Sequence, residues 1–258
     1  MTKVALVARN TFRESVRDRV LYNLIFFALL MIGSSLLVGQ LAIGNVAKVI
    51  TDIGLSSMRF FGMLIAIFIG IQLVSKEIDR RTIYSLLAKP LHRSEFVLGK
   101  FVGLGMTLAV NSSVMAAGII VSVLWVTQGY APQVVTALPA SYMVFLELLV
   151  ITGIALAMST LSSPAISALV TFLLYVVGNF SANLLTMAES TDAVAAKWLL
   201  KGLYYVLPNL SNFNVITTAA HGLTIPIDRI AAATAYAVVY CGILVAIAAL
   251  VFDRRDFK

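Results

Sequence analysis

Long uncharged, apolar runs alternate with short charged segments along this chain. Residues 20–47, 101–146, 148–188 and 230–252 contain no Asp, Glu, Lys or Arg. A hydrocarbon core about 30 Å thick takes about 20 residues of helix to cross. Each run therefore predicts at least one membrane-spanning helix, and the two longest runs have room for more.

The apolar runs are continuous rather than alternating. Inside a bilayer every backbone polar group must be bonded internally, so a spanning segment is either a helix or a strand of a closed barrel. Barrel strands alternate apolar and polar residues over about ten positions, and these runs do not. The pattern predicts an all-α integral membrane protein with six transmembrane helices in one domain, residues 1–258.

Hydropathy together with Pro and Gly positions sets the bounds of the spans. We expect them at about 21–42, 55–75, 101–128, 141–161, 165–187 and 229–252. Residues 43–54 are predicted to be a short polar connection, and Gly129 to Pro139 a loop. Ser162-Ser163-Pro164 predicts a tight turn between the fourth and fifth spans.

Two further segments are amphipathic or mixed. In residues 1–20 apolar positions recur at helical spacing while five Lys and Arg residues can face headgroups, which predicts an interfacial helix. Residues 188–228 are too polar for a full crossing and are interrupted at Pro208-Asn209. They predict a re-entrant outer segment of one or two short helices, protected by the rest of the protein.

The charges orient the chain. Only 12% of residues are charged and 60% are apolar, yet the net charge is +7. Six spans put both termini on one side, and fourteen of the nineteen Lys and Arg residues fall in segments on that side. The positive-inside rule then predicts cytoplasmic N- and C-termini. The positive excess is explained by this bias, so no nucleic-acid partner is expected.

Motifs for catalysis are missing from the sequence. There is no G-x-x-x-x-G-K-[ST] phosphate loop, no H-E-x-x-H and no G-x-S-x-G, and the only histidines are His92 and His221. The single cysteine, Cys241, lies in an apolar run. We therefore expect no catalytic, metal or cofactor site in this chain.

The most charged stretch is 76–100, between the second and third predicted spans. Residues 76–88 suit a helix with an apolar side that includes Ile78 and Ile83, and Pro90 ends it. Ser94-Glu95 then begins an amphipathic segment that leads into the third span. On charge alone, an ordinary basic loop that only sets the topology fits this stretch as well.

The order of residues in this stretch resembles the cytoplasmic loop of the type-two ABC exporter permeases, especially the branch of the nitrous-oxide-reductase maturation and gliding-motility permeases. The shared pattern is an acidic residue after the second span, Thr-x-x-x-Leu-Leu-x-x-Pro, an Arg, and Gly-Lys at the start of the third span. The matching residues are Glu77, Thr82, Leu86, Leu87, Pro90, Arg93, Gly99 and Lys100. Arg81 stands where a glycine often precedes the threonine.

The resemblance implies a non-catalytic permease subunit of an ATP-driven exporter, multi-pass in a bacterial inner membrane. It would pair with a second copy of itself or a related permease and bind two copies of a separate ABC ATPase, which would hold ATP and Mg. The helix after the second span would be the coupling helix that docks on the ATPase. Its candidate contacts are Glu77, Arg80, Arg81, Thr82, Leu86 and Leu87.

Two alternatives remain open. The chain could couple cytoplasmic ATP hydrolysis mechanically to a periplasmic or accessory partner, or it could be an ion-coupled secondary transporter working alone. The latter needs ionisable groups within the membrane. Arg59 and Glu147 are the candidates, one to two turns inside the outer boundary of their spans, either paired with each other or each reaching the headgroups.

Polar residues inside the spans are candidates for a substrate path. These are Asn111, Ser112, Asn179 and Asn183. Such residues more often hydrogen-bond to a neighbouring helix, and both interpretations stay open. Membrane lipids are the remaining expected partner, and the sequence selects no substrate.

Overall fold

The structure is a computed structural model that describes residues 3–41, 44–79, 93–129, 131–191 and 193–254. All regular elements in these residues are helical. Five of the helices are long and apolar enough to cross a membrane. They are α2 (Arg19–Leu41), α3 (Val46–Asp79), α5 (Arg93–Thr127), α6 (Pro132–Leu161) and α11 (Ile227–Arg254).

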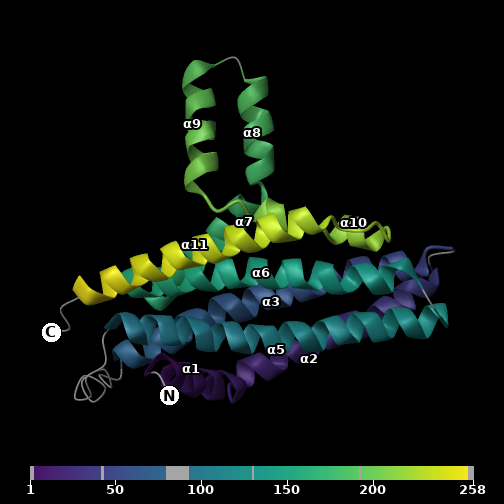
Figure 1. Cartoon of the computed structure of the whole chain (residues 1–258), viewed down its shortest axis with the longest axis horizontal. Coiled ribbons are helices and arrows are strands. Elements are labelled where there is room, and N and C mark those ends of the chain that lie inside the picture. Colours follow the sequence, from purple (N-terminus) through teal and green to yellow (C-terminus); the bar gives the residue numbers. More distant parts are fainter. Residues whose placement is uncertain (1–2, 42–43, 80–92, 130, 192, 255–258) are drawn as a thin grey trace.

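The long helices lie side by side in one elongated bundle (Figure 1). Both chain termini lie at the same end, here called the terminal end, where α3 finishes and α5 begins. The opposite end, with the connection between α5 and α6, is called the distal end. α6 is the central helix and packs against α3, α5, α7 and α11.

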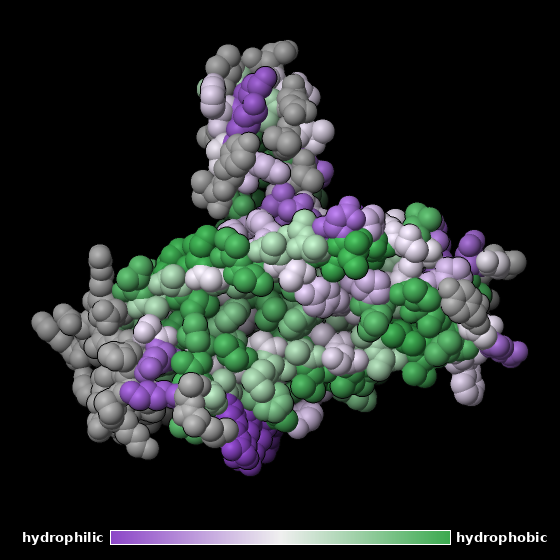
Figure 2. Space-filling model, in the orientation of Figure 1, coloured by the Kyte–Doolittle hydropathy of each residue, from purple (hydrophilic) through white to green (hydrophobic). Residues whose placement is uncertain are grey.

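The burial of these helices separates the core from the periphery. In α6, 78% of the most apolar window is buried, against 22% in α2 and 28% in α11. The outer helices expose large apolar side chains such as Phe26, Leu37 and Val238. Hydrophobic residues cover much of the bundle surface in Figure 2. Such a surface is suited to lipid, which supports the multi-pass membrane class predicted from the sequence.

A second, smaller part of the chain projects from the bundle. α7 (Pro164–Asn179) is followed, after Phe180, by α8 (Ser181–Ser190) and then by α9 (Val194–Val206). α8 and α9 pack mainly on each other and form a hairpin that stands away from the bundle (Figure 1). The hairpin therefore leaves most of its surface uncovered by its own chain.

The chain returns to the bundle through two short elements. These are the 3₁₀ helix η1 (Leu210–Phe213) and α10 (Ile216–Ala220). Leu210, Phe213 and Ala219 are fully buried, and α10 packs on α3 and α6. Within the predicted re-entrant segment 188–228, one part thus projects as a hairpin and another is packed into the core.

Two helix starts differ from the sequence-based bounds. α3 begins at Val46, so most of the predicted connection 43–54 is helical. α6 begins at Pro132, not near 141, and contains Pro139. Proline is favoured in the first turn of a helix because its missing N–H has no partner there in any case. The predicted loop from Gly129 to Pro139 is therefore wrong beyond its first residues.

The predicted fifth span, 165–187, is divided in the structure. α7 has 16 residues, which corresponds to about 24 Å of helix and is short for a core of about 30 Å. A Cβ on Gly178 would lie 2.7 Å from the carbonyl oxygen of Pro208. At Phe180 the chain turns away from α7 into α8 of the hairpin (Figure 1), so no single helix continues to 187. Six full-length spans are therefore not confirmed.

Candidate functional site

The predicted coupling stretch joins two of the longest helices. Residues 76–79 continue α3 without a break, and Arg93 is the first residue of α5. For Glu77 and Arg93 the backbone is described but the side chains lie outside the described part. The other predicted ATPase contacts and the loop residue Pro90 lie outside the described residues. These contacts are Arg80, Arg81, Thr82, Leu86 and Leu87.

Close helix packing fixes the start of α5 at the terminal end. The N-terminal helix α1 (Lys3–Val16) lies along α5. A Cβ added to Gly99 would lie 2.6 Å from Cβ of Val7, and one added to Gly103 would lie 2.6 Å from the carbonyl oxygen of Ala8. Both positions therefore need glycine for α1 to approach this closely. Gly99 of the sequence motif thus has a packing role.

Lys100, the next motif residue, is buried in the same contact. Its side chain is almost fully buried, and Nζ lies 3.7 Å from Oε2 of Glu14 in α1. Nζ also lies 5.6 Å from the ring centre of Phe96, a geometry in which a cation is attracted to the aromatic face. Lys100 therefore ties α1 to α5 by charge as well as by packing.

A second aromatic contact brings the last helix to the same place. The rings of Phe96 in α5 and Phe252 in α11 are stacked with centres 5.8 Å apart. α1, α5 and α11 are thereby joined within the first two turns of α5. A force applied to residues 76–100 would act on several packed helices at once, because stiff packed elements move as bodies.

Charged side chains meet in the bundle core. Arg59 of α3 donates two hydrogen bonds to Glu147 of α6, from Nε to Oε2 and from Nη2 to Oε1, both of 2.7 Å. This is the bidentate form that gives the strongest carboxylate–guanidinium pairs. Glu147 is completely buried, and the side chain of Arg59 is 14% exposed.

Asn179, at the end of α7, completes this cluster. Its Nδ2 donates to Oε1 of Glu147 at 3.3 Å, and its Oδ1 accepts a hydrogen bond from Nη2 of Arg59. The cluster of Arg59, Glu147 and Asn179 therefore joins α3, α6 and α7. The structure brings the two candidate charges together, and neither one reaches out separately.

The location of Glu147 within its helix differs from the sequence-based expectation. Glu147 lies fifteen residues from Pro132 and fourteen from Leu161, at the middle of α6. α6 begins nine residues earlier than the predicted span, and the predicted depth of Glu147 in the bilayer, one to two turns inside the outer boundary, stays a prediction. Arg59 lies thirteen residues into α3, level with Glu147.

The four polar candidates for a substrate path occupy separate environments. Asn179 belongs to the charge cluster, and Ser112 borders a cavity between α5 and α6. Asn111 is buried in α5, and Asn183 is exposed on α8. The structure does not bring these four side chains together.

In the sequence, Asn209 stands out only as part of the interruption at Pro208-Asn209. In the structure its Oδ1 accepts hydrogen bonds from Ser181 and Ser211, of 2.7 and 2.6 Å. Its backbone N–H donates to the hydroxyl of Tyr236 at 2.9 Å. Asn209 thus connects η1, α8 and α11 at the base of the hairpin. A polar residue directly after a proline in an apolar stretch was the available signal.

The described residues were also compared with the requirements of a metal site. Among the described residues, no three or more His, Cys, Asp or Glu side chains are grouped so that they could hold a metal ion.

Nearly the whole chain matches one known protein family. The family model described as "ABC-2 family transporter protein" matches residues 5–257. A curated relative, "Probable ABC transporter permease protein NosY" of Stutzerimonas stutzeri, is 32% identical over 114 residues, which make up 42% of this chain and 41% of the relative. The match thus spans about two fifths of the length of that relative.

Proposed function

Because the chain belongs to the ABC-2 transporter family and is a transmembrane subunit of an ABC transporter, we propose that it is an exporter permease. It works as a dimer, with two separate ATPase subunits docked on residues 76–100. The family match over residues 5–257 carries this proposal. Members of the family are non-catalytic membrane subunits, so ATP and Mg are held by the partner ATPase.

The geometry of the terminal end supports docking at this stretch. Any ATPase movement must reach the spans through an element that does not bend, and α3 extends as a 34-residue helix up to Asp79. α5 begins at Arg93 and is held by α1 and α11 within its first turns. Closure of the ATPase dimer would rotate these helices as a packed unit.

The distribution of Lys and Arg residues supports the orientation of the chain in the membrane. In Figure 1 the first turns of α1 and α5 lie at the same end as the last turns of α3 and α11. Along the sequence, fourteen of the nineteen Lys and Arg residues fall in residues 1–19, 76–100 and 253–258, which contain or adjoin these turns. The positive-inside rule places this end in the cytoplasm of a bacterial inner membrane. In this orientation the chain crosses outward for the last time through α7 and the segment up to α10, which together do not form one continuous helix.

The projecting hairpin supports a dimer. α8 and α9 have few contacts with their own bundle, and Trp198 on α9 is 72% exposed. The hairpin also carries Lys197 and Lys201, which are costly to place in lipid alone. A second copy of the chain offers both apolar and polar surface for it.

A proton-coupled transporter remains the alternative that one observation favours. Glu147 is a completely buried carboxylate at the middle of a central helix, which is where proton relays are found. Both of its oxygens accept hydrogen bonds from Arg59, so proton uptake would have to break this pair. The ATP-driven function needs no such step.

The experiment is co-purification of the tagged chain with the ATPase encoded beside it. We expect a reading frame with a phosphate loop next to the gene, a stable complex of the two proteins in detergent, and ATP hydrolysis by that complex in proteoliposomes. The proposed function is wrong if no such frame exists, no ATPase co-purifies, and a proton gradient alone drives uptake of a solute by liposomes that contain the chain.

A further inference from the structure

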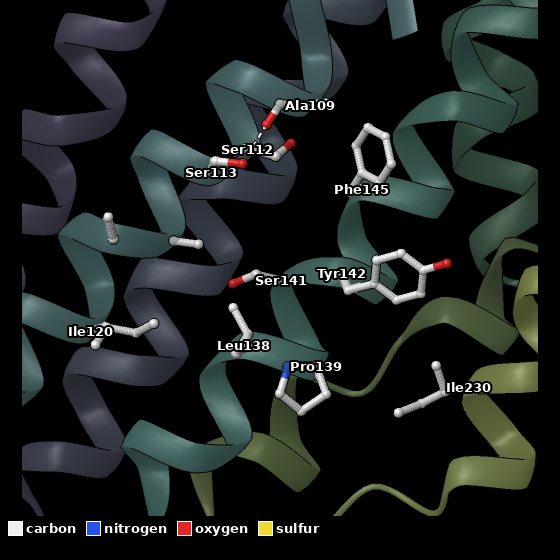
Figure 3. A pocket seen from close by; sticks show the side chains of 12 residues that line it. Ala109, Ser112, Ser113, Ile120, Leu138, Pro139, Ser141, Tyr142, Phe145 and Ile230 are labelled. Atoms are coloured by element: carbon white, nitrogen blue, oxygen red, sulfur yellow. Dashed lines mark hydrogen bonds between the residues drawn. The ribbon is translucent and has the colours of Figure 1, made fainter. Parts of the chain in front are cut away.

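A cavity of about 670 Å³ lies between α5, α6 and the first turn of α11. Its volume falls within the range of about 300–1,000 Å³ that is common for small-molecule sites. Figure 3 shows Ser112 and Ser113 on one side of it, with Ser141 and Tyr142 on the other. Ile230 of α11 closes the third side.

The sequence explains why the helices leave this space. Six residues of α5 line the cavity at helical spacing, and all but Ile120 are small: Ala109, Ser112, Ser113, Ala116 and Ala117. On α6 the facing position is Pro139, which cannot make the regular backbone hydrogen bond of a helix interior. The small side chains of α5 therefore leave room in front of the α6 wall, to which Leu138, Tyr142 and Phe145 also belong.

One polar group in the wall is left without a partner. Ser141 is 4% exposed, and its Oγ has no hydrogen bond within the described part of the protein. By contrast, Oγ of Ser113 donates to the carbonyl of Ala109 at 2.7 Å. Buried hydroxyls are nearly always hydrogen-bonded, so the Ser141 hydroxyl, which borders the cavity, calls for a partner inside it.

The cavity opens toward the lipid-facing surface. Leu138 and Tyr142 at its rim are 64% and 39% exposed. Ile230 follows directly after the exposed residues Asp228 and Arg229, and charged residues avoid the hydrocarbon core. The cavity therefore lies close to the depth at which the bilayer becomes polar, where amphipathic molecules keep their polar ends.

From this geometry we propose that the cavity binds a neutral, largely apolar molecule that enters sideways from the bilayer and hydrogen-bonds to Ser141. The residues that line it in the described chain carry no charge, so an ionised headgroup would find no partner there. A lipid with apolar chains and one free hydroxyl or carbonyl fits the wall. As a site for cargo the proposal rests on the exporter function; as a binding site it does not.

Photolabelling of the purified chain in phosphatidylcholine nanodiscs tests the proposal. The probe is a diacylglycerol with a diazirine on one acyl chain, and the reference is an alkane with the same diazirine. We expect the diacylglycerol to label the cavity-lining segments of α5 and α6 in preference to other lipid-facing helices. Labelling spread evenly over all exposed spans would overturn the proposal.

Two variants separate the space from the hydrogen bond. Ala117→Phe fills the cavity from an exposed position and should abolish the preference, whereas Val121→Phe, one turn along α5 and outside the cavity, should leave it unchanged. Ser141→Ala should lower labelling by the diacylglycerol about 2- to 10-fold and leave labelling by the alkane unchanged. Equal labelling of Ala117→Phe and the native chain contradicts the site.

The same preparation identifies the occupant. Ala117→Cys, in a chain with Cys241→Ala, should not form a disulfide between two copies. If it does, a second copy covers the cavity and the proposal fails. With the ATPase bound, loss of the diacylglycerol label on adding ATP identifies cargo, and retention identifies a resident lipid. Labelling needs no ATPase, so its failure and failure of co-purification are independent results.

Discussion

Arg59 and Glu147 stabilise the bundle only as a pair. Each charge alone would be buried without a partner, since Glu147 is completely buried and its oxygens accept hydrogen bonds from Arg59 and Asn179. Removing one partner of such a pair typically costs more than replacing both by apolar residues. The sequence could mark both residues as candidates but could not pair them, because 88 positions separate them and helix packing sets the contact.

We predict that Glu147→Gln lowers the free energy of unfolding by about 3–5 kcal/mol, because the guanidinium is left buried without its counter-charge. The double variant Arg59→Met, Glu147→Met should recover most of that loss. Unfolding in mixed micelles of dodecyl sulfate measures both. Asp52→Asn, an exposed change on α3, serves as the control; a loss from Glu147→Gln no larger than this control would contradict the role of the pair.

Gly103 offers a second test at a single residue. Gly103→Ala places a methyl group 2.6 Å from the carbonyl oxygen of Ala8, so α1 must move away from α5, at a cost of about 1–3 kcal/mol. Gly242→Ala on α11 meets no atom within 4 Å and should stabilise the helix by up to about 1 kcal/mol. Opposite signs in the same unfolding measurement are expected; the same sign for both would show that α1 is not packed as described.

At the scale of the elements, the charge-free runs predicted where helices lie but not where a helix is interrupted. The predicted first span, 21–42, is close to α2, because its bounds are set by Arg19 and a polar connection. The break at Phe180 could not be predicted, since 165–187 contains neither charge nor proline after Pro164. Next to the break, Gly178 packs against the carbonyl oxygen of Pro208 and Asn179 hydrogen-bonds to Glu147, contacts between residues far apart in the sequence.

In the proposed dimer, the hairpin of α8 and α9 is the element that contacts the second chain. In a chain with Cys241→Ala, a cysteine at Trp198 should form a disulfide between two copies under mild oxidation, because this position is exposed and projects from its own bundle. A cysteine at Trp125, 78% exposed near the end of α5, is the matched control. Cross-linking at Trp125 with none at Trp198 would place the dimer contact elsewhere.

For the molecule as a whole, the resemblance inferred from 76–100 is confirmed by the family match over residues 5–257. Composition excluded a soluble protein, and the motif pointed to the family. Neither could show that Gly99 and Lys100 hold α1 against α5, because motif spacing carries no information about a helix 90 residues earlier. The central claim is that force from a separate ATPase enters the membrane part through this stretch.

Charge reversal in the coupling stretch tests that claim most directly. The double variant Glu77→Lys, Arg81→Glu is compared with Asp52→Lys, which reverses an exposed charge near the other end of α3. In proteoliposomes with the partner ATPase, we predict that the double variant loses ATPase binding and coupled ATP hydrolysis while Asp52→Lys retains both. If the double variant still assembles and hydrolyses ATP as the native complex does, residues 76–100 are not the coupling site.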